Sequence, residues 1–343
     1  MKKLWLYSVR AYVRIGLFFY FRRIHIHGLN NIPKDKPVLL LSNHQNALLD
    51  ALLIATKCGR FAYFLTRAAV FKKPFVSKIL NSLQMLPVYR VRDGWKTIAN
   101  NNAIFKTCSE LLHQNELVVI FPEGSHNLVR RVRPLSKGFT RIVFDTLEKY
   151  PDTDLQLIPV GLNFVNAVQF PDSAALYFGS PISAKSFVLD NRKDSVVNLK
   201  KTIQSEISKL TTHIPIDDYD NSLRKLDALR VNYLEPKQVN TCIEENFENC
   251  RQLTKSKIHW LKQILKMLLI VNILPPYLIW KLIFQPKIKE LEFVATFRFA
   301  VTITLVPIYL LSIAFVLSAL LSLKLAIIYV ISVLILSLIT TKL

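Results

Sequence analysis

The C-terminal end of the chain constrains the fold most, because it is almost free of charged residues. Phe299–Leu323 holds 25 residues without a charge and Leu325–Thr341 holds a further 17, with only Lys324 between them. A helix needs about 20 apolar residues to cross a bilayer. The sequence therefore predicts a transmembrane helical hairpin over residues 299–341, with Lys324 at its turn. One very hydrophobic helix buried in a soluble core would not need this length.

A third apolar stretch, residues 263–286, is interrupted by polar and helix-breaking residues. Its longest uncharged run has 14 residues, and it contains Asn272, two adjacent prolines and Lys281. If this stretch crossed the bilayer, the cations that follow it would lie opposite the basic first half of the chain, against the positive-inside tendency. We therefore expect a re-entrant or interfacial segment here.

The first 23 residues combine aromatic and aliphatic side chains with Lys and Arg at both ends. Arg10 and Arg14 interrupt the apolar run, and no small-residue cleavage site follows, so the pattern does not indicate a signal peptide. It is typical of an amphipathic helix at the membrane interface over residues 1–23. The alternative is a core helix of a soluble domain.

The positive charge of the chain is concentrated in its first half. The 343 residues carry a net charge of +21, and residues 1–150 hold 24 Lys and Arg against 8 Asp and Glu. Such a basic region attracts polyanions: nucleic acid, anionic lipid or phosphorylated substrates. No RNA-binding motif, zinc finger or basic zipper accompanies it. Because the C-terminus is so apolar, we expect membrane lipids as partners and no nucleic acid.

The spacing of the cysteines indicates the redox state of the cellular compartment. The four thiols, Cys58, Cys108, Cys242 and Cys250, include no C-x-x-C pair. This excludes a disulfide scaffold and a four-thiolate zinc site, and it predicts reduced thiols. We therefore expect an integral membrane protein whose catalytic domain lies on the cytoplasmic face.

Short apolar runs alternate with amphipathic ones between residues 24 and 215. Strands that alternate with helices predict an α/β fold, with a mainly parallel sheet sandwiched by helices. Residues 216–262 are polar and predict a helical linker that leads back to the bilayer. The predicted strands are Ile24–His27, Val38–Ser42, Leu117–Phe121 and Leu155–Val160, and the predicted helices are Asn46–Lys57, Trp95–Gln114 and Lys200–Leu210.

His44 and Asp50 form the first group of candidate catalytic residues. His44 follows a buried strand and Asp50 lies at the start of the next helix, which places both at the carboxyl edge of the sheet. Ligand sites of α/β folds favour that edge. The Asp can accept the imidazole Nδ1–H and leave the other ring nitrogen free as a base.

Two further groups could bind substrate. Phe121-Pro122-Glu123-Gly124-Ser125 follows a strand, where Gly124 lets the backbone approach a ligand and Glu123 can bind cationic groups or hydroxyls. Arg90 follows Leu86-Pro87-Val88-Tyr89 and can bind a phosphate with two hydrogen bonds. A basic set downstream could also hold a phosphate or contact anionic lipid: Arg130, Arg131, Arg133 and Lys137.

Together these blocks resemble the glycerophospholipid acyltransferase family, which makes lysophosphatidic and phosphatidic acid. Four blocks appear in the family's order from about Gly28 to Pro181: Asn43-His44 with Asp50, Leu86-Pro87-Val88-Tyr89-Arg90, Phe121-Pro122-Glu123-Gly124, and Leu157-Ile158-Pro159-Val160. The first and third blocks in one chain are the specific ones.

Three departures from the family pattern concern the acceptor. Five residues separate His44 from Asp50 instead of the usual four. Gln84 occupies the position, three residues before Pro87, where the second block usually has Gly. His126 occupies the position where the third block usually has Arg. The wider gap and this histidine resemble fungal-type enzymes that act on glycerol-3-phosphate. The nearby arginines would then supply the phosphate binding that the missing Arg provides.

The resemblance implies direct acyl transfer from acyl-CoA or acyl-carrier protein to 1-acylglycerol-3-phosphate, or alternatively to glycerol-3-phosphate. His44, oriented by Asp50, would remove the proton of the acceptor hydroxyl. Substrate binding would fall to Arg90, Glu123, Gly124, Ser125 and Lys137. No metal and no cofactor beyond the acyl-thioester co-substrate is implied. The chain also has no G-x-S-x-G nucleophile elbow.

Two other classes of function remain open. The chain could be a basic membrane module that binds anionic lipid without catalysis. It could also be a metallohydrolase that uses His25, His27, His44 and Asp50, because His25 and His27 share one strand face.

Overall fold

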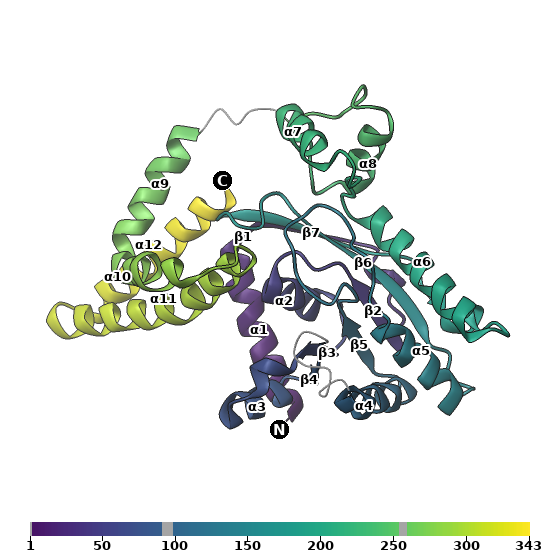
Figure 1. Ribbon diagram of the computed structural model, residues 1–343. Helices are drawn as coiled ribbons and strands as arrows, with labels where there is room; N and C mark the ends of the chain where they lie inside the picture. Colours follow the sequence, from purple (N-terminus) through teal and green to yellow (C-terminus); the bar gives the residue numbers. More distant parts are fainter. Residues whose placement is uncertain (1, 91–98, 254–258) are drawn as a thin grey trace.

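A computed structural model describes residues 2–90, 99–253 and 259–343 of the chain, without the side chains of Lys2 and His259 (Figure 1). An eight-stranded sheet lies at its centre, with the strand order β1-β7-β6-β2-β5-β3-β4 and β8 paired to β6. The strands are β1 (Phe21–His27), β2 (Val38–Ser42), β3 (Ala62–Arg67), β4 (Met85–Val88), β5 (Leu117–Ile120), β6 (Gln156–Phe164), β7 (Asp172–Phe178) and β8 (Ile182–Ser183).

Most of the sheet is parallel. β6, β2, β5, β3 and β4 run in one direction, β7 is antiparallel to β6, and β1 is parallel to β7. The carboxyl ends of β2, β4 and β5 therefore meet at one edge of the sheet. This edge carries the residues that follow those three strands in the sequence.

Helices cover both faces of the sheet, so the α/β sandwich expected from the sequence is confirmed. Along β2, Val38 and Leu40 belong to one core while Leu39 and Leu41 belong to the other. This is the two-residue alternation of a strand that is buried on both sides. The first core includes residues of α1 (Lys2–Tyr20), α2 (Ala47–Lys57) and α11 (Glu292–Leu320), and the second includes residues of α4 (Asn101–His113), α5 (Gly138–Lys149) and α6 (Arg192–Leu210). A shorter helix, α3 (Pro74–Ser82), precedes β4.

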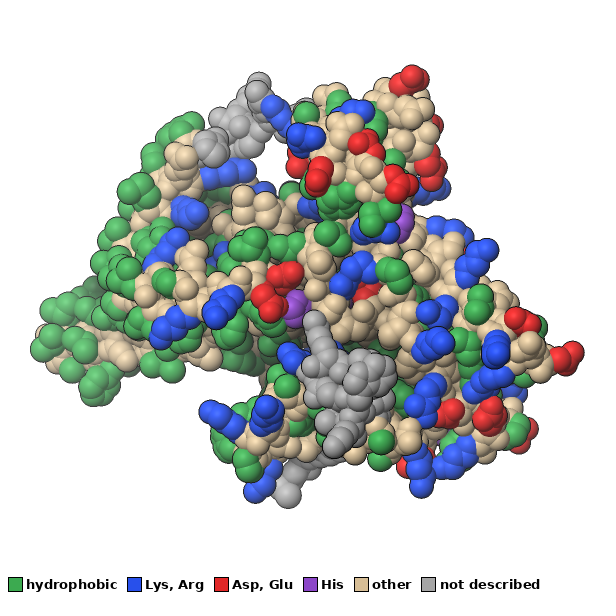
Figure 2. Space-filling view, in the orientation of Figure 1, with side chains coloured by type: hydrophobic (Ala, Val, Ile, Leu, Met, Phe, Trp, Pro, Cys, Tyr) green, Lys and Arg blue, Asp and Glu red, His purple; other side chains and the backbone are tan. Residues whose placement is uncertain are grey.

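The C-terminal hairpin is present as two long apolar helices. α11 and α12 (Leu323–Lys342) lie side by side and extend away from the sheet (Figure 1). Both are long and apolar enough to cross a membrane. Their surface in Figure 2 is mostly hydrophobic, which supports membrane association. Lys324 lies in the first turn of α12, and α11 begins at Glu292, seven residues before the predicted span.

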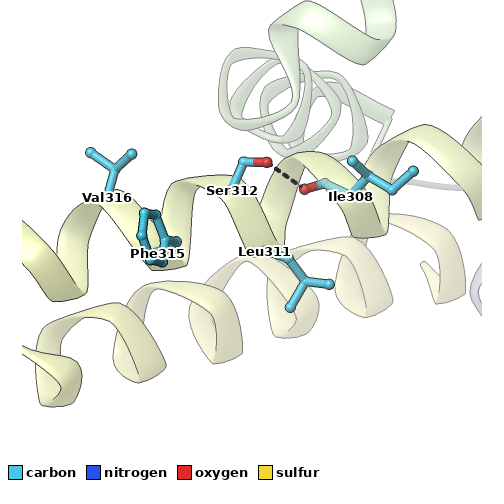
Figure 3. A pocket seen from close by; sticks show the side chains of 5 residues that line it. All are labelled: Ile308, Leu311, Ser312, Phe315 and Val316. Atoms are coloured by element: carbon cyan, nitrogen blue, oxygen red, sulfur yellow. Dashed lines mark hydrogen bonds between the residues drawn. The ribbon is translucent and has the colours of Figure 1, made fainter.

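Polar groups inside this hairpin are satisfied locally. Ser312 donates a hydrogen bond of 3.0 Å to the Ile308 carbonyl one turn earlier. Figure 3 shows Leu311, Phe315 and Val316 projecting around it from α11, where they line a shallow apolar recess. A hydroxyl that bonds to its own helix can lie in lipid without an unpaired donor.

The segment before the hairpin is bent. α9 (His259–Asn272) is followed by α10 (Leu274–Leu278) and a π-helical stretch (Ile279–Phe284), and the chain turns by 101° at the break. Pro275 and Pro276 lie at that break, where proline cannot continue a preceding helix. A sharp bend fits either a broken span or a re-entrant loop, so the re-entrant segment stays a prediction.

Helix α1 has two different faces. Leu17 and Tyr20 are buried against the sheet and α11, whereas Leu4, Trp5 and Phe18 are exposed. Its C-terminal end is capped by α12, because Lys342 Nζ lies 2.7 Å from the Phe18 carbonyl and 2.8 Å from the Phe21 carbonyl. α1 is thus packed on one side and presents large apolar groups on the other, and its place at the membrane interface remains a prediction.

Residues 216–253 form a small folded unit beside the sheet. The predicted polar segment contains α7 (Tyr219–Leu229) and α8 (Pro236–Glu244), whose apolar sides enclose Leu226, Val239 and Cys242. The Asp217–Asn221 cluster, which we expected to be part of a linker, includes the start of α7 because Asp218 is the N-cap residue of that helix.

The expectation of four reduced thiols is wrong for two of them. Cys242 and Cys250 form a disulfide with a Cα–Cα distance of 4.9 Å. Asn246 and Phe247 adopt positive φ angles after α8, which turns the chain back so that the two cysteines meet. Cys58 and Cys108 are free and buried.

Candidate active site

His44 and Asp50 are in contact, as the sequence predicted. His44 follows β2 directly, and Asp50 lies in the first turn of α2, so a short turn brings the chain back onto itself. The His44 Nδ1 and Asp50 Oδ2 atoms are 2.8 Å apart, and the Asp50 side chain is fully buried. A buried carboxylate at this distance fixes the ring orientation and the position of the Nδ1 proton.

The neighbouring asparagines hold this turn in place. The Asn43 side chain donates to the Leu162 carbonyl at 2.9 Å and accepts from the Leu162 amide at 2.7 Å, which ties the end of β2 to β6. The backbone amide of Asn46 donates to Asp50 Oδ2 at 2.7 Å. The same carboxylate oxygen therefore binds both the start of α2 and the His44 imidazole.

Aromatic groups enclose the His44 ring on two sides. Phe121, at the end of β5, stacks on the imidazole with a centroid distance of 4.1 Å. His126 meets the ring edge to face at 5.6 Å, and the Asn127 amide donates to the His44 carbonyl at 3.0 Å. The loop after β5 thus packs on His44, so the first and third sequence blocks lie next to each other in the structure.

Glu123 and Ser125 share a partner in Arg133. Arg133 Nε lies 2.6 Å from Glu123 Oε2, and its guanidinium also donates to the Ser125 hydroxyl at 2.8 Å and to the Ser125 carbonyl. Gly124 between them has a φ of +75° and would place an added Cβ in open space. Glycine is required there for the left-handed turn.

Burial raises the pKa of Glu123 to about 7, although Arg133 and the His44 backbone hydrogen bond act in the opposite direction. Burial also lowers the pKa of His126, and the neighbouring His44 lowers it further. The loop after β5 therefore carries two groups whose charge depends on the burial of the site.

Arg90 lies near this cluster and Lys137 does not contact it. Arg90 follows β4 and is close enough to His126 to lower its pKa. The preceding turn is held by Asn101, which bonds both the amide and the carbonyl of Tyr89 at 2.9 and 2.8 Å. Lys137 is exposed at the start of α5, and its ammonium group makes no hydrogen bond or ion pair to the described residues.

Two members of the predicted basic set bind inside the protein. Arg130 donates to the carbonyls of Phe164 and Val165 at 2.9 and 2.7 Å and lies 3.5 Å from the centre of the Tyr233 ring. Arg133 is bound to Glu123 and Ser125, as described above. Each guanidinium thus uses some of its five N–H donors inside the protein, and the structure gives no support for phosphate binding by either one.

The start of α11 also contributes to the site, although no sequence motif indicates it. Thr296 Oγ1 accepts a hydrogen bond of 3.2 Å from the Leu48 amide in the first turn of α2. Phe293 contacts His126 with a centroid distance of 4.6 Å. Glu290 and Glu292 stand close to the same imidazole. The base of the hairpin thus forms one wall of the site.

The metal-ligand set that the sequence left open is not assembled. His25 and His27 lie on β1, which is three strand positions from β2 in the sheet. Neighbouring strands are about 4.8 Å apart, so roughly 14 Å separates them from His44. Donor atoms of one metal ion must lie within a few Å of one another, which excludes a centre built from His25, His27, His44 and Asp50.

Residues 23–163 match the family model described as acyltransferase. This part of the chain belongs to the acyltransferase family. The match contains β2, β4 and β5, the His44–Asp50 pair and the Glu123–Arg133 pair. The resemblance stated from the sequence is confirmed.

Curated relatives are distant acyltransferases whose names state two different acceptors. Glycerol-3-phosphate O-acyltransferase 1 of Saccharomyces cerevisiae is 26% identical over 141 residues, which is 39% of this chain and 18% of that protein. The 1-acyl-sn-glycerol-3-phosphate acyltransferase of Borreliella burgdorferi is 23% identical over 223 residues, which is 65% of this chain and 79% of that protein. The chain thus spans less than a fifth of the length of the yeast relative.

A solved structure aligns with part of the chain. The 1-acyl-sn-glycerophosphate acyltransferase of Thermotoga maritima aligns with a TM-score of 0.45 and 18% identity, covering 61% of this chain and 80% of that one.

Proposed function

We propose that the chain is a membrane-bound O-acyltransferase that transfers a fatty acyl group from an acyl thioester to the hydroxyl of 1-acylglycerol-3-phosphate. The product would be phosphatidic acid, an intermediate of phospholipid biosynthesis. The observation that carries the proposal is the 2.8 Å contact between His44 Nδ1 and the buried Asp50 carboxylate. It lies at the carboxyl edge of the parallel strands, where α/β folds bind their ligands.

The pair can carry out direct transfer. With its Nδ1 proton held by Asp50, His44 keeps the lone pair of Nε2 free to accept the proton of the acceptor hydroxyl. The hydroxyl oxygen then attacks the thioester carbonyl, and collapse of the tetrahedral intermediate expels the thiolate, which takes the proton from His44. General base catalysis of this kind contributes a factor of roughly 10² to 10⁴.

The remaining predicted residues take different parts in this proposal. Arg90, which is near enough to His126 to lower its pKa, would contact the acceptor phosphate. Glu123, Gly124 and Ser125 would act through the loop that Arg133 holds rather than through direct contacts. Lys137 would contact anionic lipid or substrate phosphate only at the rim of the site, because it is exposed.

Two observations favour 1-acylglycerol-3-phosphate as the acceptor: the share of one relative's length that the chain covers, and the contact between the apolar hairpin and the site. The chain covers 79% of the Borreliella relative, whose name states this acceptor, and its hairpin base reaches the site. An acceptor that already carries one acyl chain resides in the bilayer. With the hairpin as a membrane anchor, we place the α/β domain on the cytoplasmic face, with acyl-CoA or acyl-carrier protein as the donor.

A second candidate acceptor is glycerol-3-phosphate. The yeast relative carries that name, and the five-residue gap between His44 and Asp50 resembles fungal-type enzymes.

An acceptor assay tests the proposal. Membranes that contain the chain are incubated with a labelled acyl thioester, of coenzyme A or of carrier protein, and either acceptor. Phosphatidic acid formed from the 1-acyl acceptor alone is the expected result. Product from glycerol-3-phosphate alone would replace the first candidate with the second. Lipid binding without product from either acceptor and either donor would contradict both and favour the non-catalytic membrane module.

A further inference from the structure

A third histidine beside the catalytic pair lies in a cluster of potential metal ligands. His126, Glu290 and Glu292 each offer one donor atom, and these three atoms lie within 4.8 Å of one another. The histidine comes from the loop after β5 and the two carboxylates from the first residues of the hairpin, more than 160 positions later in the sequence. Figure 2 shows acidic side chains next to a histidine at the base of the apolar hairpin.

Aromatic rings hold the His126 ring in place on two sides, but its Nδ1 atom has no hydrogen-bond partner in the part of the chain that the structure describes. The ring lies between His44 and Phe293, with centroid distances of 5.6 and 4.6 Å. Its Nδ1 atom is buried and has no hydrogen-bond partner among the described residues. A buried imidazole nitrogen normally has such a partner, and an ion bound at this atom would supply one.

From these observations we propose that His126, Glu290 and Glu292 form a divalent-cation site beside the catalytic pair. One imidazole and two carboxylates suit a first-row ion such as Mn²⁺ or Zn²⁺. Donor atoms around such an ion stand about 3 to 4 Å apart, and the rotatable bonds of two glutamates can close the small remaining difference. Three protein ligands leave positions open, as in sites that bind substrate.

The open positions would bind phosphate oxygens of the acceptor, a role that rests on the proposed function. Two carboxylates close to His44 would repel an acceptor that carries a phosphate. A divalent cation cancels their charge and bridges them to the phosphate, with Arg90 as a further positive group nearby. The site is complete only when the hairpin is seated on the α/β domain, so it would couple acceptor binding to that docking.

A simpler explanation covers only part of the cluster. Glu292 is the first residue of α11 and Glu290 lies two residues before it, at the end where acidic side chains stabilise a helix through its dipole. That effect requires no histidine, and it does not provide a partner for the buried Nδ1 of His126. It predicts two carboxylates that bind no metal.

Mn²⁺ binding to the full-length chain in detergent, without substrate, tests the site. After removal of metals with a chelator, the free Mn²⁺ signal is followed by electron paramagnetic resonance during titration. We expect one bound ion per chain, and at least a tenfold loss of affinity in Glu290→Gln, Glu292→Gln and His126→Gln. Glu248→Gln removes an exposed carboxyl elsewhere and should bind as the unaltered chain does. Thermal unfolding of each variant confirms that it is folded.

Absence of stoichiometric binding, or unchanged affinity in the three variants, would overturn the site and leave the helix-start explanation. Because this assay needs no acyl transfer, its outcome is independent of the proposed function. The bridging role has its own readout. Glu292→Gln should raise KM for the phosphate acceptor about tenfold with little change in kcat, and metal binding without this effect would overturn the role alone.

Discussion

Asp50 serves two groups with one oxygen atom. Its Oδ2 accepts from the Asn46 amide at 2.7 Å and lies 2.8 Å from His44 Nδ1, so it joins the start of α2 to the catalytic ring. Removing the side chain would disturb both. An isosteric change keeps an acceptor for Asn46 while altering the partner of the imidazole.

Asp50→Asn should therefore lower kcat by a factor of about 10² to 10⁴, because a neutral amide neither selects the Nδ1–H tautomer nor stabilises the imidazolium. Steady-state acyl transfer is the measurement. Asp190→Asn, an exposed carboxyl before α6, should leave kcat unchanged. An Asp50→Asn enzyme with full activity would show that the carboxylate has only a structural part.

Glu123 should make the stability of the protein depend on pH. Its pKa is raised to about 7 in the folded chain from an ordinary value near 4.5, so the folded state binds a proton more tightly than the unfolded state between these values. The stabilisation from this protonation is present below about pH 4.5 and is lost as pH rises through about 7. Thermal unfolding of the protein and of Glu123→Gln from pH 5 to 8 measures it.

The unaltered protein should lose stability relative to Glu123→Gln as pH rises through this window. Parallel pH profiles for the two proteins would contradict the assignment of a raised pKa to Glu123.

The pair His44–Asp50 and the Phe121–Gly124 turn could be predicted because each is local in the sequence. Arg133 was predicted to bind a phosphate or anionic lipid, since nothing in the sequence shows that it binds Glu123 and Ser125. His126 was recognised as a departure from the family pattern, but its contact with the hairpin depends on residues far away in the chain.

At the level of elements, the packing of β6 against the end of α6 depends on two contacts, one of which leaves no room for a side chain. An added Cβ at Gly161 in β6 would lie 2.1 Å from the Leu210 carbonyl oxygen at the end of α6. The same carbonyl accepts a hydrogen bond of 2.9 Å from the side-chain amide of Asn163. The end of α6 is thus fixed on the sheet by the absence of a side chain and by one polar contact.

Gly161→Ala should destabilise the fold by about 1 to 3 kcal/mol, because backbone rather than a flexible side chain must move. Gly138→Ala is the matched control, since its Cβ would meet Phe105 at an ordinary 3.7 Å. Denaturation in detergent compares the two. Equal stabilities would contradict the tight packing of β6 against α6.

Buried strands and amphipathic helices were predicted well where the apolar pattern is strong. β2 has the bounds expected, and β5 differs by one residue. β3 was not predicted as a strand, and α7 lay in a cluster interpreted as linker. These segments are short or polar, and their structure depends on neighbours in the sheet or on the small core around Leu226.

For the whole molecule, the membrane hairpin is also part of the site. Thr296 binds the first turn of α2, and Phe293 contacts His126, so the apolar hairpin and the candidate site meet within the first residues of α11. Hydropathy predicted the hairpin itself, because two long uncharged runs indicate spans without further information. It could not predict where the hairpin docks, since those contacts join residues about 170 to 250 positions apart.

If α11 and α12 both cross the bilayer, the turn between them and the α/β domain lie on opposite sides. In sealed vesicles, an impermeant thiol reagent should label Ser322→Cys from one side and Ser186→Cys from the other. Ser186 is exposed in the α/β domain, and the two native free thiols are buried. With vesicles of known orientation, Ser186→Cys should react from the cytoplasmic side. Labelling of both from one side would contradict a spanning hairpin.

The most direct measurement compares acyl transfer by His44→Ala and His25→Ala in membranes, at equal protein levels. His25 is exposed on the edge strand β1, far from the site. Transfer abolished in His44→Ala and unchanged in His25→Ala is the predicted result, because only His44 can accept the proton of the acceptor hydroxyl. Transfer that survives His44→Ala would contradict general base catalysis by this pair.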